Sequence, residues 1–363
     1  MTNPAGMVDW DLAVATANRL MSPGPDVSRS EAEAAVESLH RSAAVAAGHV
    51  ERVTGLQATG PTPPTRVIDR PAWVRVNADG MQRLLTPLID KLEQKRPHPV
   101  GRLTQAVGPR VTGLQAGAVL AFLSGKVLGQ FEFFAEPGGQ LLLVAPNVVD
   151  AERLLGVDPG DFRLWVCLHE ITHRLQFTAV PWLRGYLTTE IDALVEAIDL
   201  DPDALRERLA NIGREIGRMV RGERDASGGR LGLIGLVQSP AQRVVIDRLT
   251  AFMSLVEGHA EYAMNAVGTD VVPSLPMLRE RFGRRRQGTS PVDRLVRRVL
   301  GLDLKIRQYA DGSAFVRAVV DAVGLDGFNV VWTSAETLPQ RVELAAPLDW
   351  VERVHGFRPA ASA

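Results

Sequence analysis

The N-terminal part of the chain contains two helical patterns and a segment rich in glycine and proline. Residues 8–55 have the apolar spacing of two helices, interrupted at residues 23–25, which read Pro-Gly-Pro. Ser28 or Ser30 is the expected N-cap of the second helix, because acidic residues follow in its first turn. Residues 55–71 are dominated by Gly, Pro and Thr, which predicts a loop.

The next segments show first a helical and then a strand-like period. Between Trp73 and Lys95 apolar residues recur at helical spacing, among them Met81, Leu84, Leu85, Leu88 and Leu92. Residues 113–127 predict a buried helix. The period then changes, because residues 129–134 and 141–145 flank a Glu-Pro-Gly-Gly turn, a pattern typical of two strands joined by a turn.

The rest of the chain is mostly helical in pattern. A helix follows the turn at residues 158–161 and runs to about Phe177. Further helical segments are expected at 186–199, 201–221, 240–266, 291–300 and 303–322. We therefore predict a mainly α member of the α+β class, with one small sheet directly before the helix that ends near Phe177.

Composition restricts the chemistry more than it identifies it. The chain has 363 residues, 45% of them hydrophobic and 23% charged, as in ordinary globular proteins. The formal net charge of -1 gives no general attraction to nucleic acid or anionic membranes, so we expect neither partner. A single cysteine, Cys167, excludes an intramolecular disulfide and any metal site built from several cysteines. A transition-metal site in this chain must therefore consist of His and carboxylate side chains.

The sequence shows no targeting or membrane-spanning segment. Its start lacks the basic and apolar regions of a secretory signal. The longest apolar run, residues 116–123, is far shorter than the roughly 20 residues that a membrane helix needs. We expect a soluble, cytoplasmic protein.

A metal-binding motif lies on the helix that ends near Phe177. His169, Glu170 and His173 form an H-E-x-x-H sequence. One turn of helix separates the two histidines, so both imidazoles can bind one metal ion. Glu170 lies about 100° round the helix from His169, near enough to reach a water molecule at that metal. The alternative is a coincidental pair of histidines on an ordinary helix.

A catalytic zinc site needs a third protein ligand. The metzincin motif would require Gly and His where this chain has Gln176 and Ala179, which excludes that class. Glu257 and Glu261 lie one turn apart in a helical stretch downstream, so Glu257 could bind the metal while Glu261 supports a ligand histidine. His259 is the rival third ligand, but its helical phase favours a core or supporting role.

Two sequence resemblances agree with this interpretation. The segment 257–262, Glu-Gly-His-Ala-Glu-Tyr, resembles the third-ligand segment of gluzincin aminopeptidases, in which the first Glu binds zinc. However, Glu257 lies 84 positions after His173, a longer gap than in that family. The chain more closely resembles zincin-like metallopeptidases labelled as associated with coenzyme F420 biosynthesis, which also share segments 302–312 and 327–333. This resemblance implies a zincin-like fold and a zinc hydrolase, but it transfers no substrate.

The chain is also expected to divide into two regions. We expect an N-terminal helical region at 1–110 and a zincin-like core with a helical C-terminal part at 111–363, unless the two form one continuous domain.

Tyr309, Arg307 and Tyr262 are candidates to stabilise an oxyanion opposite the metal. Cys167 is turned about 200° from His169 and is expected to be a small core residue.

Two further segments have ordinary explanations. The glycine-rich segment 228–235 follows a charged helix rather than a strand, so it is expected to be a loop or lid rather than a phosphate-binding loop. Arginines at 279–286, 294, 297 and 298 form a basic cluster, which most simply predicts a solvated face.

The sequence thus predicts a zinc-dependent hydrolase of the peptidase type, acting on a peptide or protein. His169, His173 and Glu257 are the expected zinc ligands and Glu170 the general base. The competing hypothesis is a non-catalytic zincin scaffold with a structural metal site or a partner-binding role. A direct part in coenzyme F420 metabolism is a third hypothesis, although no residue of the chain indicates cofactor binding.

Overall fold

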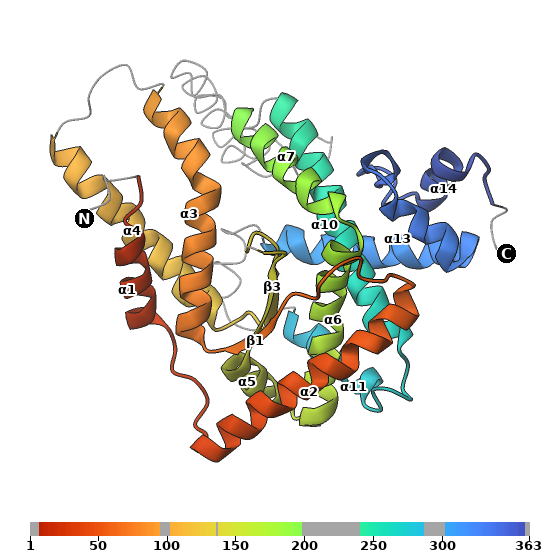
Figure 1. Ribbon diagram of the computed structural model, residues 1–363, viewed down its shortest axis with the longest axis horizontal. Coiled ribbons are helices and arrows are strands. Elements are labelled where there is room, and N and C mark those ends of the chain that lie inside the picture. The colour runs from red at the N-terminus through yellow and green to blue at the C-terminus, as the bar shows by residue number, and fades with distance from the viewer. Residues whose placement is uncertain (1–6, 95–101, 136, 198–239, 287–301, 360–363) are drawn as a thin grey trace, which may run out of the picture.

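The computed structural model describes residues 7–94, 102–135, 137–197, 240–286 and 302–359. Within these ranges the chain is mainly helical with one small sheet, as predicted (Figure 1). In chain order the described elements are α1 (Trp10–Leu20), α2 (Arg29–Thr54), β1 (Thr65–Ile68), α3 (Arg70–Gln94), α4 (Arg102–Ser124), β2 (Gly129–Glu132), β3 (Gln140–Val144), α5 (Ala145–Leu155), α6 (Pro159–Ala179), α7 (Trp182–Glu196), α10 (Pro240–Ala266), α11 (Leu275–Arg286), α13 (Leu302–Asn329), the 3-10 turns η1 (Val330–Trp332) and η2 (Ala335–Thr337), and α14 (Pro347–His355).

The sheet has three strands in the order β1-β3-β2. The predicted hairpin is confirmed, because β2 pairs antiparallel with β3. The prediction of a continuous loop at 55–71 is wrong, because β1 lies within it and pairs in parallel with β3. The four residues of β1 are flanked by prolines, and they are extended because a distant strand satisfies their backbone groups.

The predicted pair of N-terminal helices is confirmed. Ser28 caps α2: its hydroxyl faces the backbone N–H of Glu31, and the Glu31 carboxylate accepts from the backbone N–H of Ser28. This reciprocal arrangement satisfies two backbone donors that the first turn of a helix leaves unpaired. The helix ends at Gly55, which has a φ of 68° that favours glycine.

Helix α6 occupies the centre of the main hydrophobic core. Helices α2 and α10 pack against it, and so do strands β2 and β3 (Figure 1). Its buried residues include Phe162, Leu168 and Ile171, while Cys167 is fully buried as predicted. The element that carries the H-E-x-x-H motif is therefore held on several sides.

A second hydrophobic cluster joins α1, α3 and α4 to the sheet. It contains Val14 and Ala17 of α1, Trp73 of α3, Leu120 of α4 and Val144 of β3. Glycines permit the close approach of α1 and α4: a Cβ added at position 113 would lie 2.5 Å from the carbonyl oxygen of Asp9, and one at position 117 equally near that of Ala13. The division at residue 110 stays a prediction, although α4 itself runs across that boundary from Arg102 to Ser124.

Other helices differ from the sequence prediction in extent. Helix α4 begins before position 113 and includes Pro109, and α13 extends beyond residue 322 to Asn329 with a kink at Gly324. Helices α5, α11 and α14 were not predicted. The expected helices at 201–221 and 291–300 and the glycine-rich segment 228–235 lie outside the described residues.

One arginine of the predicted basic cluster has a structural role. Arg281 of α11 donates to the carbonyl oxygens of Leu155 and Gly156 at the C-terminal end of α5, each at 2.6 Å. A guanidinium near the last carbonyls of a helix also opposes the negative end of its dipole. Among the helices that the structure describes, none is long and apolar enough to cross a membrane.

Candidate metal centre

Helix α6 places His169 and His173 side by side. The helix starts at Pro159. Asp158 caps it, because its carboxylate accepts from the backbone N–H of Asp161, so the helix is already established two turns before the motif begins. The two imidazole rings lie nearly perpendicular with centroids 4.6 Å apart. Their Nε2 atoms approach to 3.1 Å, so both point toward one place.

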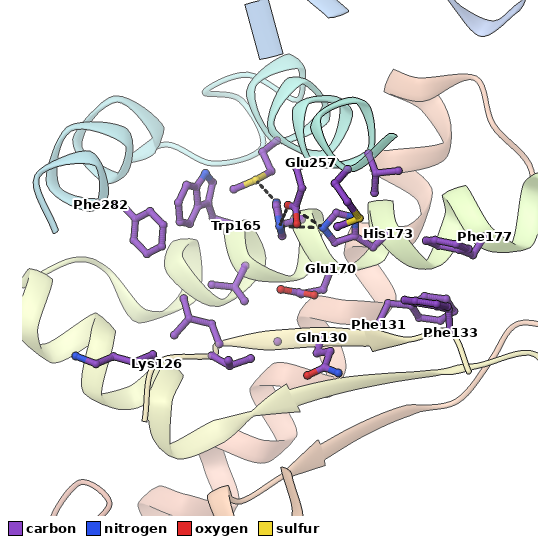
Figure 2. Close-up of a pocket in the computed structure, with 18 of the residues that line it drawn as sticks. Lys126, Gln130, Phe131, Phe133, Trp165, Glu170, His173, Phe177, Glu257 and Phe282 are labelled. Atoms are coloured by element: carbon purple, nitrogen blue, oxygen red, sulfur yellow. Dashed lines mark hydrogen bonds and ion pairs between the residues drawn. The ribbon is translucent and has the colours of Figure 1, made fainter. Parts of the chain in front are cut away.

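Helix α10 brings Glu257 to the same place. Its Oε2 lies 3.5 Å from Nε2 of His169 and 3.4 Å from Nε2 of His173 (Figure 2). In the part of the chain that the structure describes, these three side chains form the group of potential metal ligands whose atoms all lie within 4.8 Å of one another. The rival third ligand, His259, is turned away from this group and hydrogen-bonded elsewhere.

The geometry of the three atoms fits a zinc ion. Tetrahedral ligands about 2.0–2.1 Å from zinc lie roughly 3.3 Å from one another, close to the separations found here. Oε2 of Glu257 is buried and makes no ordinary hydrogen bond with a described residue. A buried carboxylate oxygen that faces two imidazole nitrogens is a suitable place for a divalent cation.

The charges of the cluster also favour a cation. Burial acts to raise the pKa of Glu257, but His173 and His169 hold that pKa well below its ordinary value. Burial acts to lower the pKa of His173, but the negative charge of the nearby Glu257 carboxylate outweighs this and raises the pKa to about 9. Positive charge is thus stabilised at this place, whether it is carried by a proton or by a metal ion.

Glu170 lies between the cluster and strand β2 (Figure 2). Its side chain passes directly over Gly129, where an added Cβ would lie 2.5 Å from Cγ of Glu170 and 2.9 Å from Oε1. Burial raises the pKa of Glu170 to about 7; His173 opposes this increase and Glu257 adds to it. A carboxyl group with this pKa can accept and return a proton near neutral pH.

The cluster opens into a pocket of about 450 Å³. Figure 2 shows Phe131, Phe133 and Phe177 together on one side of Glu170, and Trp165 and Phe282 on the other. The rings of Phe133 and Phe177 are stacked 5.1 Å apart, and those of Trp165 and Phe282 meet edge to face at 4.9 Å. The pocket is therefore apolar on both sides of a polar centre, a composition common in ligand sites.

Several residues around the ligands were not predicted from the sequence. Nδ1 of His173 lies 3.0 Å from Oε1 of Gln176, and Nδ1 of His169 lies 3.2 Å from the sulfur of Met264. Gln176 lies about one turn after His173 on the same helix, so its place beside His173 could have been inferred from the sequence. Gly129 had no such signal, because its importance depends on where α6 crosses β2.

The other site residues expected from the sequence are placed less directly. Glu261 is half-buried on α10 one turn after Glu257, and its support of a ligand histidine stays a prediction. Tyr309 and Arg307 belong to α13, but their side chains lie outside the described part of the structure. Tyr262 is half-buried and is not among the residues that line the pocket.

The two C-terminal segments that carried the family resemblance support α10. Gly312 of α13 lies against Gly258, beside Glu257, the expected third ligand, and a Cβ on either glycine would collide with the other helix. Phe328 and Trp332 flank the buried ring of His259, with centroids 5.4 and 5.2 Å from it. Both segments therefore pack against the helix that carries Glu257.

Comparisons with known proteins found a matching family and a similar solved structure. The model of a family described as zincin-like metallopeptidase matches residues 8–351. A solved structure from Chloroflexus aurantiacus, described as a provisionally assigned hydrolase with a novel fold, is 29% identical with a TM-score of 0.70. The match covers 96% of this chain and 99% of that chain. None of the curated proteins matches this sequence.

Proposed function

The chain belongs to the zincin-like metallopeptidase family, and on this premise we propose that it is a zinc-dependent hydrolase that cleaves peptide bonds. The observation that carries the proposal is the cluster of His169, His173 and Glu257 beside Glu170 at the wall of an apolar pocket. The association with coenzyme F420 is not carried over, because no feature of the pocket indicates recognition of such a cofactor.

The three ligand side chains would hold the metal through Nε2 of each histidine and a carboxylate oxygen of Glu257. Zinc in such a site supplies Lewis acidity, which lowers the pKa of water and polarises a carbonyl group. Two neutral imidazoles and one carboxylate leave a net positive charge at the bound ion, which suits the negative charge that develops when a carbonyl is attacked.

Glu170 is the proposed general base. It accepts a proton from the attacking water molecule and later delivers a proton to the leaving nitrogen. Its burial supports this role, because a carboxylate in an apolar environment is a stronger base than one in water. The packing of its side chain on Gly129 keeps the carboxylate on the pocket side of α6.

The pocket supports a peptide as the substrate. Strand β2 is at the edge of the described sheet, and residues 128–131 line the pocket beside Glu170. An edge strand can pair with an extended peptide through its backbone groups. The aromatic rings on both sides of Glu170 would then accept large apolar side chains next to the cleaved bond.

The open pocket also supports a catalytic metal site over a purely structural one. Structural zinc sites are closed by four protein ligands, whereas catalytic sites use three and leave one position for water or substrate. Within the described residues three ligands converge, and they do so at the wall of a pocket. A structural site would also have no use for Glu170 as a base.

A peptide-library cleavage assay with added zinc tests the proposal. We expect wild-type protein to cleave peptides beside large apolar residues. Glu170→Gln should retain zinc, measured by metal analysis, and should lose activity by about 10²–10⁴-fold, the usual contribution of general acid–base catalysis. His169→Ala should lose both zinc and activity.

The outcomes separate the two hypotheses. Equal cleavage by wild type and Glu170→Gln would show that the activity arises elsewhere or from a contaminant. Zinc binding with no cleavage of any library peptide would favour the non-catalytic scaffold. Equal zinc retention by wild type and His169→Ala would refute the metal site itself.

A further inference from the structure

Two proposed metal ligands on different helices share one neighbour, Gln176 of α6. Its side chain is fully buried. The amide oxygen Oε1 lies 3.0 Å from Nδ1 of His173. The amide nitrogen Nε2 lies 2.9 Å from the carbonyl oxygen of Val256 and 3.0 Å from Nδ1 of His259. Val256 and His259 flank Glu257 on α10.

The carbonyl oxygen of Val256 determines the orientation of this network. A backbone carbonyl can only accept a hydrogen bond, so the –NH₂ group of Gln176 must face it. The amide oxygen then faces His173 and accepts from Nδ1–H, which leaves the lone pair of a neutral His173 on Nε2, toward Glu257. The second amide hydrogen points to Nδ1 of His259, which therefore accepts and carries its own proton on Nε2.

The surroundings hold His259 in place as the fixed acceptor of this network. Its ring is fully buried between Phe328 and Trp332, and its Nε2 has no hydrogen-bond partner among the described residues. A buried imidazole with one unpaired nitrogen is costly, so the bond from Gln176 to the other nitrogen matters for its placement. His259 thus acts on the site through Gln176 and not as a ligand.

We propose that Gln176 is a positioning residue of the metal centre that orients the His173 imidazole and fixes the distance between His173 and Glu257. A single planar amide joins the ring of one ligand to the backbone beside another. A carboxylate could accept from His173 but could not donate to Val256 and His259. The amide is therefore required for the link between α6 and α10 and not only for the basicity of His173.

This inference rests on the metal site of the proposed function, and its test measures metal binding and not only hydrolysis. The full-length protein is stripped of metal, and its Kd for Zn²⁺ is measured by competition with a chromophoric chelator. Gln176→Leu and Gln176→Glu should each weaken zinc binding about 10–100-fold, the usual effect of losing a residue that orients a ligand.

Variants at His259 separate the hydrogen bond from the packing. His259→Phe keeps a ring between Phe328 and Trp332 but removes the acceptor, so its zinc affinity should fall about tenfold. Asparagine can place an oxygen near the position of Nδ1, so His259→Asn should bind zinc more tightly than His259→Phe. This pair decides the question if Gln176→Leu does not fold.

Thr178→Val is the matched control on α6. It removes a hydroxyl that donates to the carbonyl oxygen of Arg174, a bond that touches no ligand. Its Kd for Zn²⁺ should match that of wild type. Nitrogen NMR of metal-free protein is recorded above the His173 pKa of about 9, where the ring is neutral. It should show His173 protonated on Nδ1 in wild type and Thr178→Val, and a mixture of tautomers in Gln176→Leu.

Each outcome supports or overturns the inference. Unchanged zinc affinity and an unchanged His173 tautomer in folded Gln176→Leu would overturn it, and so would wild-type affinity in Gln176→Glu or an equal loss in Thr178→Val. If wild-type protein binds no zinc, this inference and the proposed function fail together. If wild type binds zinc without hydrolysing peptides, the proposed function fails, and weak binding by the Gln176 variants still supports the positioning role.

Discussion

Gly129 determines the position of Glu170, although it has no side chain of its own. A Cβ at this position would lie 2.5 Å from Cγ of Glu170, closer than atoms of a folded protein normally approach. In Gly129→Ala the Glu170 carboxylate must therefore move away from β2. We expect kcat to fall by about 10²-fold, because a displacement of about 1 Å from a productive geometry can cost this much. Steady-state kinetics with a cleaved library peptide measure the effect.

A neighbouring glycine provides the control for this substitution. Gly125 has no atom within 4 Å of an added Cβ, so Gly125→Ala should leave kcat unchanged. Zinc content should be the same in both variants, because Gly129 contacts the base and not the ligands. Wild-type kcat in folded Gly129→Ala would contradict the role given to this contact.

The thiol of Cys167 on α6 is fully buried, unlike the half-buried rings of His169 and His173 on the same helix. Burial, reinforced by the negative charge of Glu170 and opposed by Arg174, raises the pKa of the thiol far above its ordinary value. The folded protein therefore keeps the thiol neutral at pH 8.5, near the ordinary pKa of cysteine. We expect no alkylation by iodoacetamide in the folded state and one labelled thiol per chain in guanidinium chloride, as measured by mass spectrometry.

The same pKa shift affects stability. Above about pH 8.5 the unfolded chain loses the thiol proton whereas the folded chain retains it, so this group destabilises the fold as the pH rises. Cys167→Ala should reduce that part of the alkaline loss of stability. Rapid labelling of the folded protein at pH 8.5 would contradict the buried, neutral thiol.

Residues whose roles depend on local spacing could be predicted from the sequence. His169, Glu170 and His173 follow from helical period alone, because all three belong to one helix. Gly129 and the partners of Gln176 could not be predicted in this way, since they lie on β2 and α10 and meet α6 only through tertiary packing.

At the scale of elements, the crossing of α10 and α13 determines where Glu257 lies. Gly312 leaves no space for a Cβ, because the carbonyl oxygen of Ser254 on α10 occupies that position. Gly312→Ala should separate the helices and lower the free energy of unfolding by about 1–3 kcal/mol, the usual cost of overpacking. Because Glu257 moves with α10, zinc affinity should fall as well. Denaturant titration and zinc competition measure the two effects.

An exposed glycine in another helix controls for the intrinsic effect of alanine. Gly185 of α7 has nothing within 4 Å of an added Cβ, so Gly185→Ala should leave stability unchanged or raise it by up to about 1 kcal/mol. If Gly312→Ala is equally benign, the close crossing of α10 and α13 does not position the third ligand.

The elements that could be predicted are those with a strong period of their own. Helices α2, α6 and α10 and the β2–β3 hairpin have apolar spacing or turn residues that indicate them directly. Strand β1 has four residues within a proline-rich segment, and it forms because its backbone pairs in parallel with that of β3. Helices α11 and α14 are short, and α11 is rich in arginine, so neither has an apolar period long enough to be recognised.

At the scale of the molecule, one buried arginine ties the N-terminal helices to the core. Arg70 at the start of α3 donates to Asn147 and Asp150 of α5 and to the carbonyl oxygens of Ser22 and Pro23 between α1 and α2. Its side chain is 5% exposed, so the loss of its partners would leave a buried charge. Removing one member of such a buried network typically costs about 3–5 kcal/mol.

These contacts lead us to expect one cooperative unfolding transition rather than two. Helix α4 packs on α1 and α3, and Val144 of β3 belongs to the same hydrophobic cluster. Arg70 links α3 to α5 and to the segment between α1 and α2. The N-terminal helices therefore cannot separate without exposing the sheet. Hydrogen exchange with mass spectrometry tests this in increasing denaturant: amides of α4 and α6 should lose protection together. Arg70→Leu should shift the loss of protection in α4 and in α6 to lower denaturant by the same amount. If α4 loses protection while α6 remains protected, the N-terminal helices are an independent domain, and the boundary near residue 110 is real.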